Sequence, residues 1–132
     1  MSKVLVAEPD AFFCKFYALK LKQLGHEVNR VEDGKKAMEL LNKDKYDLIL
    51  MNIMLPFQDG YTILRNLKEG QNISTPVVVI TELSQEEDKK KAMDLGVIAY
   101  FTKTDTQIQD LLKALEPYLS HSEASQEPPQ KL

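Results

Sequence analysis

Four polar side chains of different chemistry stand just after short apolar runs in this chain. Glu8 supplies a carboxylate, Asn52 an amide, Thr81 a hydroxyl and Lys103 an ammonium group. If the runs are parallel strands, their carboxyl ends meet at one edge of a sheet, where such sheets bind ligands. We therefore expect the four groups to converge on one rim. They include no usual nucleophile–base pair, so the chain is not expected to be an enzyme.

The apolar runs have the length and composition of buried strands. Each has four residues, too few for a helix, and their continuous apolarity indicates strands covered on both faces, as in parallel sheets. The runs are residues 4–7, 48–51, 77–80 and 98–101. A fifth, mixed segment at residues 27–31 is typical of a half-exposed edge strand.

Helical patterns separate the runs. Helices are expected at 11–24 with Phe13, Tyr17, Leu21 and Leu24 on one face, at 35–42, at 61–69, after a capping box at 84–87, and after an Asp105 cap with apolar residues from Ile108 to Leu119. Strands that alternate with helices over short links favour one architecture. It is an α/β fold, a doubly wound five-stranded parallel sheet with helices on both faces.

Composition excludes several classes of protein. The 132 residues carry 17 basic and 20 acidic side chains, a net charge of −3 that gives no reason to expect nucleic acid or an anionic membrane as partner. One cysteine, Cys14, excludes an intrachain disulfide, and two distant histidines do not favour a zinc site. No run approaches the roughly 20 apolar residues of a membrane span. No signal peptide is expected, so the predicted compartment is the cytoplasm.

Several separate segments together resemble the receiver domain of two-component response regulators, over residues 3 to 119. The segment 46–56 with Asp59 and Gly60 is similar to that family's phosphoacceptor segment, and Thr75, Pro76, Thr81, Gly96, Tyr100 and Lys103 follow at matching spacing. The resemblance implies a flavodoxin-like strand order, 2-1-3-4-5. It also implies a domain at 1–119, and the polar, proline-containing segment 120–132 is expected to be a disordered tail.

The resemblance further implies a role for each residue of the rim. Glu8 matches the first of two acids that help bind Mg²⁺, and Met54 would lend a backbone carbonyl to the metal. Asn52 stands at the phosphoacceptor position and would be the third metal contact. Thr81 and Lys103 match the residues that contact the phosphoryl group. Tyr100 matches an aromatic side chain that reorients.

Three positions depart from the family pattern. Asn52 stands where an aspartate accepts phosphate, and an amide cannot serve as the nucleophile that forms an acyl phosphate. Pro9 stands at the second acid position and has no side-chain oxygen for a metal. We therefore expect Mg²⁺ to bind weakly, if at all, and no other cofactor. Thr104 replaces a proline that commonly follows a cis bond, so the bond before it is expected to be trans.

Other residues have a structural and a functional interpretation. Asp10 is expected to cap a helix, with substitution for the missing metal ligand as the alternative. Lys103 is expected in the pocket, although a loose pair with Glu8 would also explain it. Phe12 and Phe16 either pack under neighbouring loops or form an exposed patch for a partner.

The sequence predicts a receiver-like signalling module that works through protein contacts without the usual aspartyl phosphate. Its partners would be proteins: a histidine kinase, a phosphotransfer protein or an effector. One alternative is a conventional phosphorylatable receiver that carries an Asp-to-Asn change at Asn52. A second is a ligand-binding or enzymatic domain on the same fold, because a fold does not determine a function.

Overall fold

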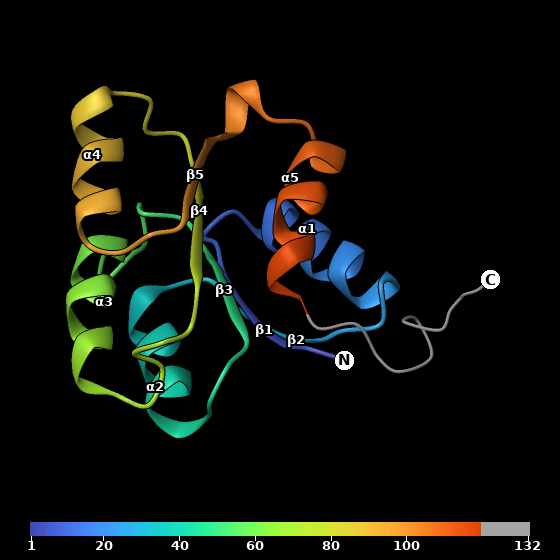
Figure 1. Ribbon diagram of the computed structural model, residues 1–132, viewed down its shortest axis with the longest axis horizontal. Helices are drawn as coiled ribbons and strands as arrows, with labels where there is room; N and C mark the ends of the chain where they lie inside the picture. Colours follow the sequence, from blue (N-terminus) through green and yellow to red (C-terminus); the bar gives the residue numbers. More distant parts are fainter. Residues whose placement is uncertain (120–132) are drawn as a thin grey trace.

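Strands and helices alternate along residues 1–119, which a computed structural model describes (Figure 1). The expected disordered tail at 120–132 lies outside the described residues. The strands are β1 Lys3–Ala7, β2 Glu27–Val31, β3 Leu48–Met51, β4 Val77–Thr81 and β5 Ala99–Thr102. The helices are α1 Ala11–Gln23, α2 Gly34–Lys43, α3 Gly60–Asn66, α4 Glu86–Asp94 and α5 Ile108–Leu115. Short 3-10 turns follow at Leu67–Glu69, Lys103–Asp105 and Glu116–Tyr118.

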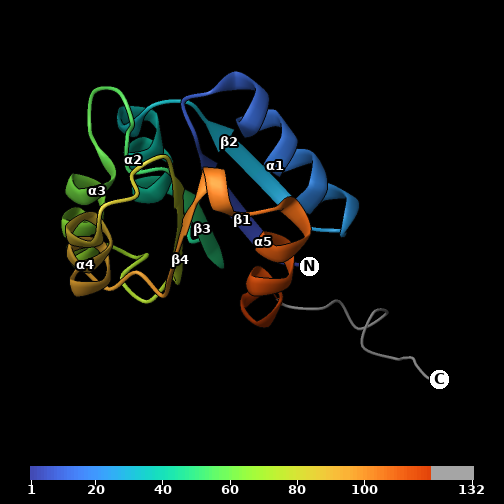
Figure 2. The same cartoon turned by 90° about the horizontal axis from the view of Figure 1, so that it is seen from above.

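The sheet has the order β2-β1-β3-β4-β5, with every neighbouring pair parallel, which confirms the expected fold and strand order. Helices α1 and α5 cover one face, and α2, α3 and α4 cover the other (Figures 1 and 2). Successive side chains of a strand point to opposite faces. In β1, Val4 and Val6 therefore pack in the core under α1 and α5, while Leu5 and Ala7 pack in the core on the other side.

The expectation of two-sided burial holds for the central strands and is wrong for the last one. All residues of β1 except Lys3, and all residues of β3 and β4, are buried. Every residue of β5 is only partly buried. The reason is its position, since β5 has a strand neighbour on one side only. The mixed segment β2 is the other edge, as expected.

Aspartates begin three of the helices. The side chain of Asp10 accepts a hydrogen bond from the Phe13 amide, which confirms the expected cap of α1. Asp33 and Asp59 do the same for α2 and α3. Leu24 was expected on the buried face of α1, but it is exposed because the helix ends at Gln23 and the chain turns away.

Two other expected caps are wrong. Helix α4 begins at Glu86 after Gln85, with no side-chain cap, so the box at 84–87 does not form. The Asp105 side chain accepts a hydrogen bond from the Thr102 hydroxyl, within a 3-10 turn that precedes α5. Helix α5 begins only at Ile108. Both predictions fail for the same reason. The helix begins two or three residues after the expected cap, at Glu86 instead of next to Ser84 and at Ile108 instead of next to Asp105.

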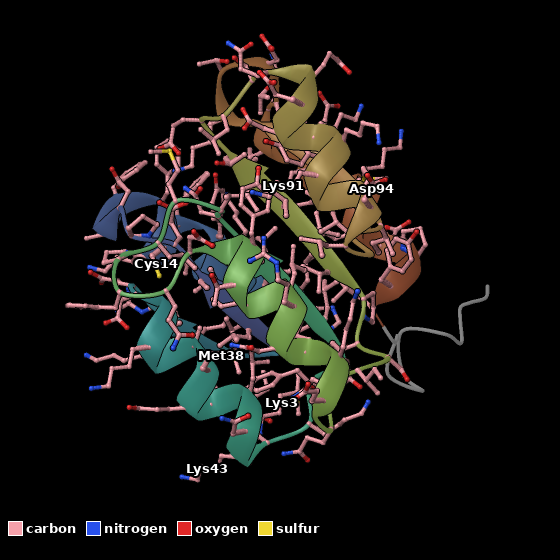
Figure 3. All side chains as sticks on the ribbon, turned by 90° about the vertical axis from the view of Figure 1, so that its left-hand side faces the viewer. Lys3, Cys14, Met38, Lys43, Lys91 and Asp94 are labelled. Atoms are coloured by element: carbon pink, nitrogen blue, oxygen red, sulfur yellow. The ribbon has the colours of Figure 1, made fainter. Side chains whose placement is uncertain are left out.

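The surface of α4 contacts α3 through an aromatic ring. Lys91 and Asp94 project from α4 (Figure 3), and the Lys91 ammonium lies 4.2 Å from the centre of the Tyr61 ring of α3. The Tyr61 hydroxyl donates to the Asp88 carbonyl. These contacts attach the polar helix to its neighbour, although its charged residues are mostly exposed.

The start of α2 touches the loop that follows β3, and this contact generates a prediction. The Gly34 amide donates to the Pro56 carbonyl at 2.9 Å, and a Cβ added at Gly34 would overlap the carbonyl of Gln58. Gly34→Ala should lower the free energy of unfolding by about 2 kcal/mol or more, because backbone must move. Gly70→Ala is the matched control, since a Cβ there meets nothing within 4 Å. Equal stability of the two variants in urea unfolding would contradict the close packing.

Candidate functional site

Four side chains at the carboxyl edge of the sheet each occupy the first position after a strand. Glu8 follows β1, Asn52 follows β3, Glu82 follows β4 and Lys103 follows β5. Because the strands are parallel and in register, these positions meet at one rim, as the sequence predicted for three of the four. Thr81, the last residue of β4, joins them.

Asn52 uses every hydrogen-bonding position of its side chain. Its Nδ2 group donates to Glu8 Oε1 at 3.1 Å and to Glu82 Oε1 at 3.0 Å. Its Oδ1 atom accepts from the Thr81 hydroxyl at 2.6 Å and from the Met54 amide at 2.9 Å. A primary amide has two N–H donors and two lone pairs, so no position remains for a further ligand.

The neighbours of Asn52 determine which way its amide points. A backbone N–H can only donate, so the Met54 amide requires the oxygen on its side. Ionised carboxylates can only accept, so Glu8 and Glu82 require the nitrogen on theirs. An aspartate could not make this arrangement, since it has no donor for two carboxylates.

Lys103 joins the same two carboxylates. Its ammonium lies 2.8 Å from Glu8 Oε1 and 3.2 Å from Glu82 Oε2. It also lies 4.5 Å from the centre of the Phe13 ring, within the range of a cation–π contact. The side chains of Lys103 and Glu8 are only 7% and 2% exposed. Lys103 is therefore in the pocket, as expected, and its pair with Glu8 is buried rather than loose.

Both oxygens of the first acid position bond to protein groups. Glu8 Oε1 accepts from Asn52 and Lys103, and its Oε2 accepts from the Asp10 amide at 2.8 Å. The Asp10 carboxylate caps α1. Its backbone, rather than its side chain, contacts the Glu8 carboxylate. Pro9, between them, offers no side-chain oxygen.

A divalent metal does not fit this donor set. Such an ion needs oxygen ligands, and Mg²⁺ wants them at nearly octahedral positions. Asn52 directs its nitrogen at the carboxylates, and the ammonium of Lys103 already contacts both of them. Among residues 1–119, no group of three or more His, Cys, Asp or Glu side chains is arranged to hold a metal ion.

The remaining expected site residues lie around the rim. The Tyr100 hydroxyl donates to the Leu83 carbonyl at 2.8 Å, and burial, with smaller contributions from Tyr61 and Asp88, raises the pKa of Tyr100 to about 12. No cis peptide bond occurs in residues 1–119, so the Lys103–Thr104 bond is trans as expected.

Phe12 supports the patch interpretation rather than burial under loops. Its side chain is 69% exposed, and its ring stacks on that of the partly buried Phe16. Helix α1 therefore presents an aromatic surface.

Glu82 is the site residue that sequence reasoning missed. Burial alone would raise its pKa, but hydrogen bonds from Asn52, from its own backbone and from Lys103 hold the pKa of Glu82 below its ordinary value. The available signal was its position, immediately after Thr81 and the β4 run. The family pattern includes the Thr81 hydroxyl and assigns no role to the next residue, Glu82.

Comparisons with known proteins point to one family. Residues 4–116 match the family model of the response regulator receiver domain. Response regulator ArlR of Staphylococcus saprophyticus is 34% identical over 119 residues, which are 90% of this chain and 53% of that protein. The gliding motility regulatory protein of Myxococcus xanthus is 33% identical over 97 residues, which are 73% of this chain and 12% of that protein. The chain thus spans about half the length of the first of these relatives and about an eighth of the length of the second.

Solved structures agree with the match. The receiver domain of the Francisella response regulator 1452 has 33% identity and a TM-score of 0.81, over 89% of this chain and 96% of that one. The receiver domain of the sensor histidine kinase PA1611 of Pseudomonas aeruginosa has 25% identity and a TM-score of 0.78, over the same two shares. That structure has a magnesium ion coordinated in its active site cleft. No helix within residues 1–119 of the present chain could cross a membrane.

The lowered pKa of Glu82 predicts how stability depends on pH. Its charged form is favoured in the folded state, so its contribution is present above the ordinary pKa and is lost as the pH falls through the lowered one. Glu82→Gln should therefore destabilise the chain at neutral pH and have a smaller effect in acid. Urea unfolding at both pH values measures this difference. Glu39→Gln, at an exposed position of α2, is the control. A penalty for Glu82→Gln that does not shrink in acid would contradict the electrostatic explanation.

Proposed function

The chain belongs to the response regulator receiver family, and on that premise we propose that it is a signalling module that does not accept a phosphoryl group at position 52. Receiver domains are signalling modules of two-component systems, and response regulators interact with kinases and effectors. In our proposal this one acts through protein contacts alone, with its rim held by internal bonds.

The observation that carries the proposal is the bonding of Asn52. Formation of an acyl phosphate needs a carboxylate oxygen as nucleophile, and an amide oxygen is neutral and poorly nucleophilic. The Oδ1 atom of Asn52 already accepts two hydrogen bonds, and its Nδ2 group faces two carboxylates. Neither end of the side chain is available to a phosphodonor.

The loss of carboxylate ligands for a metal ion supports the same proposal. The PA1611 receiver domain holds a magnesium ion in its cleft. In the present chain Pro9 removes one carboxylate, Asn52 removes another, and Glu8 is committed to Lys103. Phosphoryl transfer depends on a cation that neutralises developing charge, so loss of the metal ligands and of the nucleophile act in the same direction.

The partner in this proposal is a protein. Curated relatives include transcriptional regulators, which are longer than this chain, so their activities do not identify its partner. The exposed Phe12 ring, which stacks on the partly buried Phe16, is one feature that a protein partner could cover.

Chemical phosphorylation tests the proposed function directly. After incubation with a small phosphodonor such as acetyl phosphate and Mg²⁺, the native chain should keep its mass, because Asn52 cannot form an acyl phosphate. Intact-mass spectrometry provides the measurement. Asn52→Asp is the matched variant, and it reports whether position 52 alone blocks the reaction. A stable phosphoryl adduct on a carboxylate of the native rim would refute the proposal.

Metal affinity gives an independent test. Calorimetry of the native chain should detect weak Mg²⁺ binding or none, because neutral amide and water oxygens do not offset dehydration of the ion. Asn52→Asp should improve binding only in part, since Pro9 still supplies no ligand. Pro9→Asp combined with Asn52→Asp should bind best. If the native chain already binds Mg²⁺ as tightly as the double variant, the carboxylates at these positions are not what limits binding.

A further inference from the structure

The rim holds a lysine amine and a primary amide that contact the same oxygen atom. Glu8 Oε1 lies 2.8 Å from the ammonium nitrogen of Lys103 and 3.1 Å from the side-chain nitrogen of Asn52. The two nitrogens belong to the residues that follow β5 and β3, the strands on either side of β4. An amine and an amide are the two reactants of an isopeptide bond, and their shared contact keeps them together.

Lys103 has the surroundings of a nucleophile. Its side chain is only 7% exposed, and its nitrogen lies 4.5 Å from the centre of the Phe13 ring. Loss of contact with water in such a pocket is one of the ways in which a lysine becomes reactive. The buried carboxylate of Glu8 is the base, because transfer of one proton from the ammonium to this carboxylate removes two buried charges at once.

The amide of Asn52 has the surroundings of an electrophile. Its Oδ1 atom accepts from the Thr81 hydroxyl at 2.6 Å and from the Met54 backbone amide at 2.9 Å. Attack on Cγ places negative charge on this oxygen, and donors aimed at it stabilise the tetrahedral intermediate. The Nδ2 group contacts Glu8, so the nitrogen that must leave faces a group that can protonate it.

We propose that Lys103 and Asn52 form an isopeptide bond with each other, with Glu8 as the proton carrier. This inference goes beyond the proposed function, because it assigns the rim a reaction of its own. After Lys103 has lost a proton to Glu8, its Nζ atom attacks Cγ of Asn52. The Nζ–Cγ bond forms, and the Cγ–Nδ2 bond breaks.

The protons of this step balance within the site. Of the three protons on the ammonium, one stays on the new amide nitrogen, one moves through Glu8 to the leaving nitrogen, and one stays on Glu8. The Nδ2 atom of Asn52 leaves as ammonia, with its own two protons and the one it receives. No oxidant, reductant or further reactant is needed.

The product suits the burial of the rim. Glu8 ends as a neutral carboxylic acid, which costs less in a buried position than an unpaired carboxylate. Glu82, whose side chain is 54% exposed, keeps its charge in contact with solvent. The new bond joins the ends of β3 and β5 across β4. Because the ammonia diffuses away, the bond persists.

Mass spectrometry of the folded chain tests the proposal. After several days at neutral pH, the native chain should be lighter than its sequence mass by one ammonia molecule. A protease digest should contain the peptide with residue 52 joined to the peptide with residue 103. Lys103→Arg keeps a positive charge beside Glu8 and should retain the full mass, as should Glu8→Gln. Lys90→Arg, on the exposed surface of α4, is the matched control and should lose ammonia as the native chain does.

A native chain that keeps its full mass overturns the proposal. Loss of ammonia without joined peptides also overturns it, because a succinimide formed at an asparagine releases the same molecule. A loss that persists in Lys103→Arg, or joined peptides in Glu8→Gln, has the same consequence. Circular dichroism checks the fold of the variants, and the native chain alone decides the outcome if they are unfolded. Phosphorylation adds mass to a sample, whereas this reaction removes mass before any phosphodonor is present, so the two proposals fail separately.

Discussion

The rim of this receiver domain depends on the charge of one buried carboxylate. Glu8 follows the interior strand β1 and has almost no contact with water, so its charge must be balanced inside the protein. Lys103 supplies the balance at 2.8 Å. Removal of one partner from a buried pair generally costs about 3–5 kcal/mol, because the other charge is left unpaired. Asn52 bonds to Glu8 and Glu82 bonds to Lys103, so both contact this pair.

The bonds of Glu82 and Leu83 connect the rim to the segment between β4 and α4. Glu82 bonds to Asn52 and Lys103, and the next residue, Leu83, accepts from the Tyr100 hydroxyl. Two consecutive residues are thus attached to β5 and its end and to the residue that follows β3. In our account this segment has one arrangement, because no metal or phosphoryl group enters the rim to provide another. A partner would then recognise a surface that does not change with phosphorylation.

Sequence reasoning predicted what short-range patterns determine. Continuous apolar runs identified the central strands, and the position after each run identified Glu8, Asn52 and Lys103 as rim residues. It failed where the answer depends on three-dimensional neighbours. The pattern around Asp105 favoured a helix cap, but a bond with Thr102 takes that side chain. Glu82 was not predicted, because only the fold brings it into contact with Asn52 and Lys103.

The most direct test of the account is a two-dimensional ¹⁵N–¹H NMR spectrum of the native chain, recorded with and without a phosphodonor and Mg²⁺. If the bonds of Asn52 and Lys103 to Glu8 and Glu82 take the place of metal and phosphate, the backbone signals of residues 81–85 and 100 and the side-chain amide signals of Asn52 should remain unchanged. Shifts at these positions, saturating as phosphodonor and Mg²⁺ are added, would show that the rim still responds to them and would contradict the account.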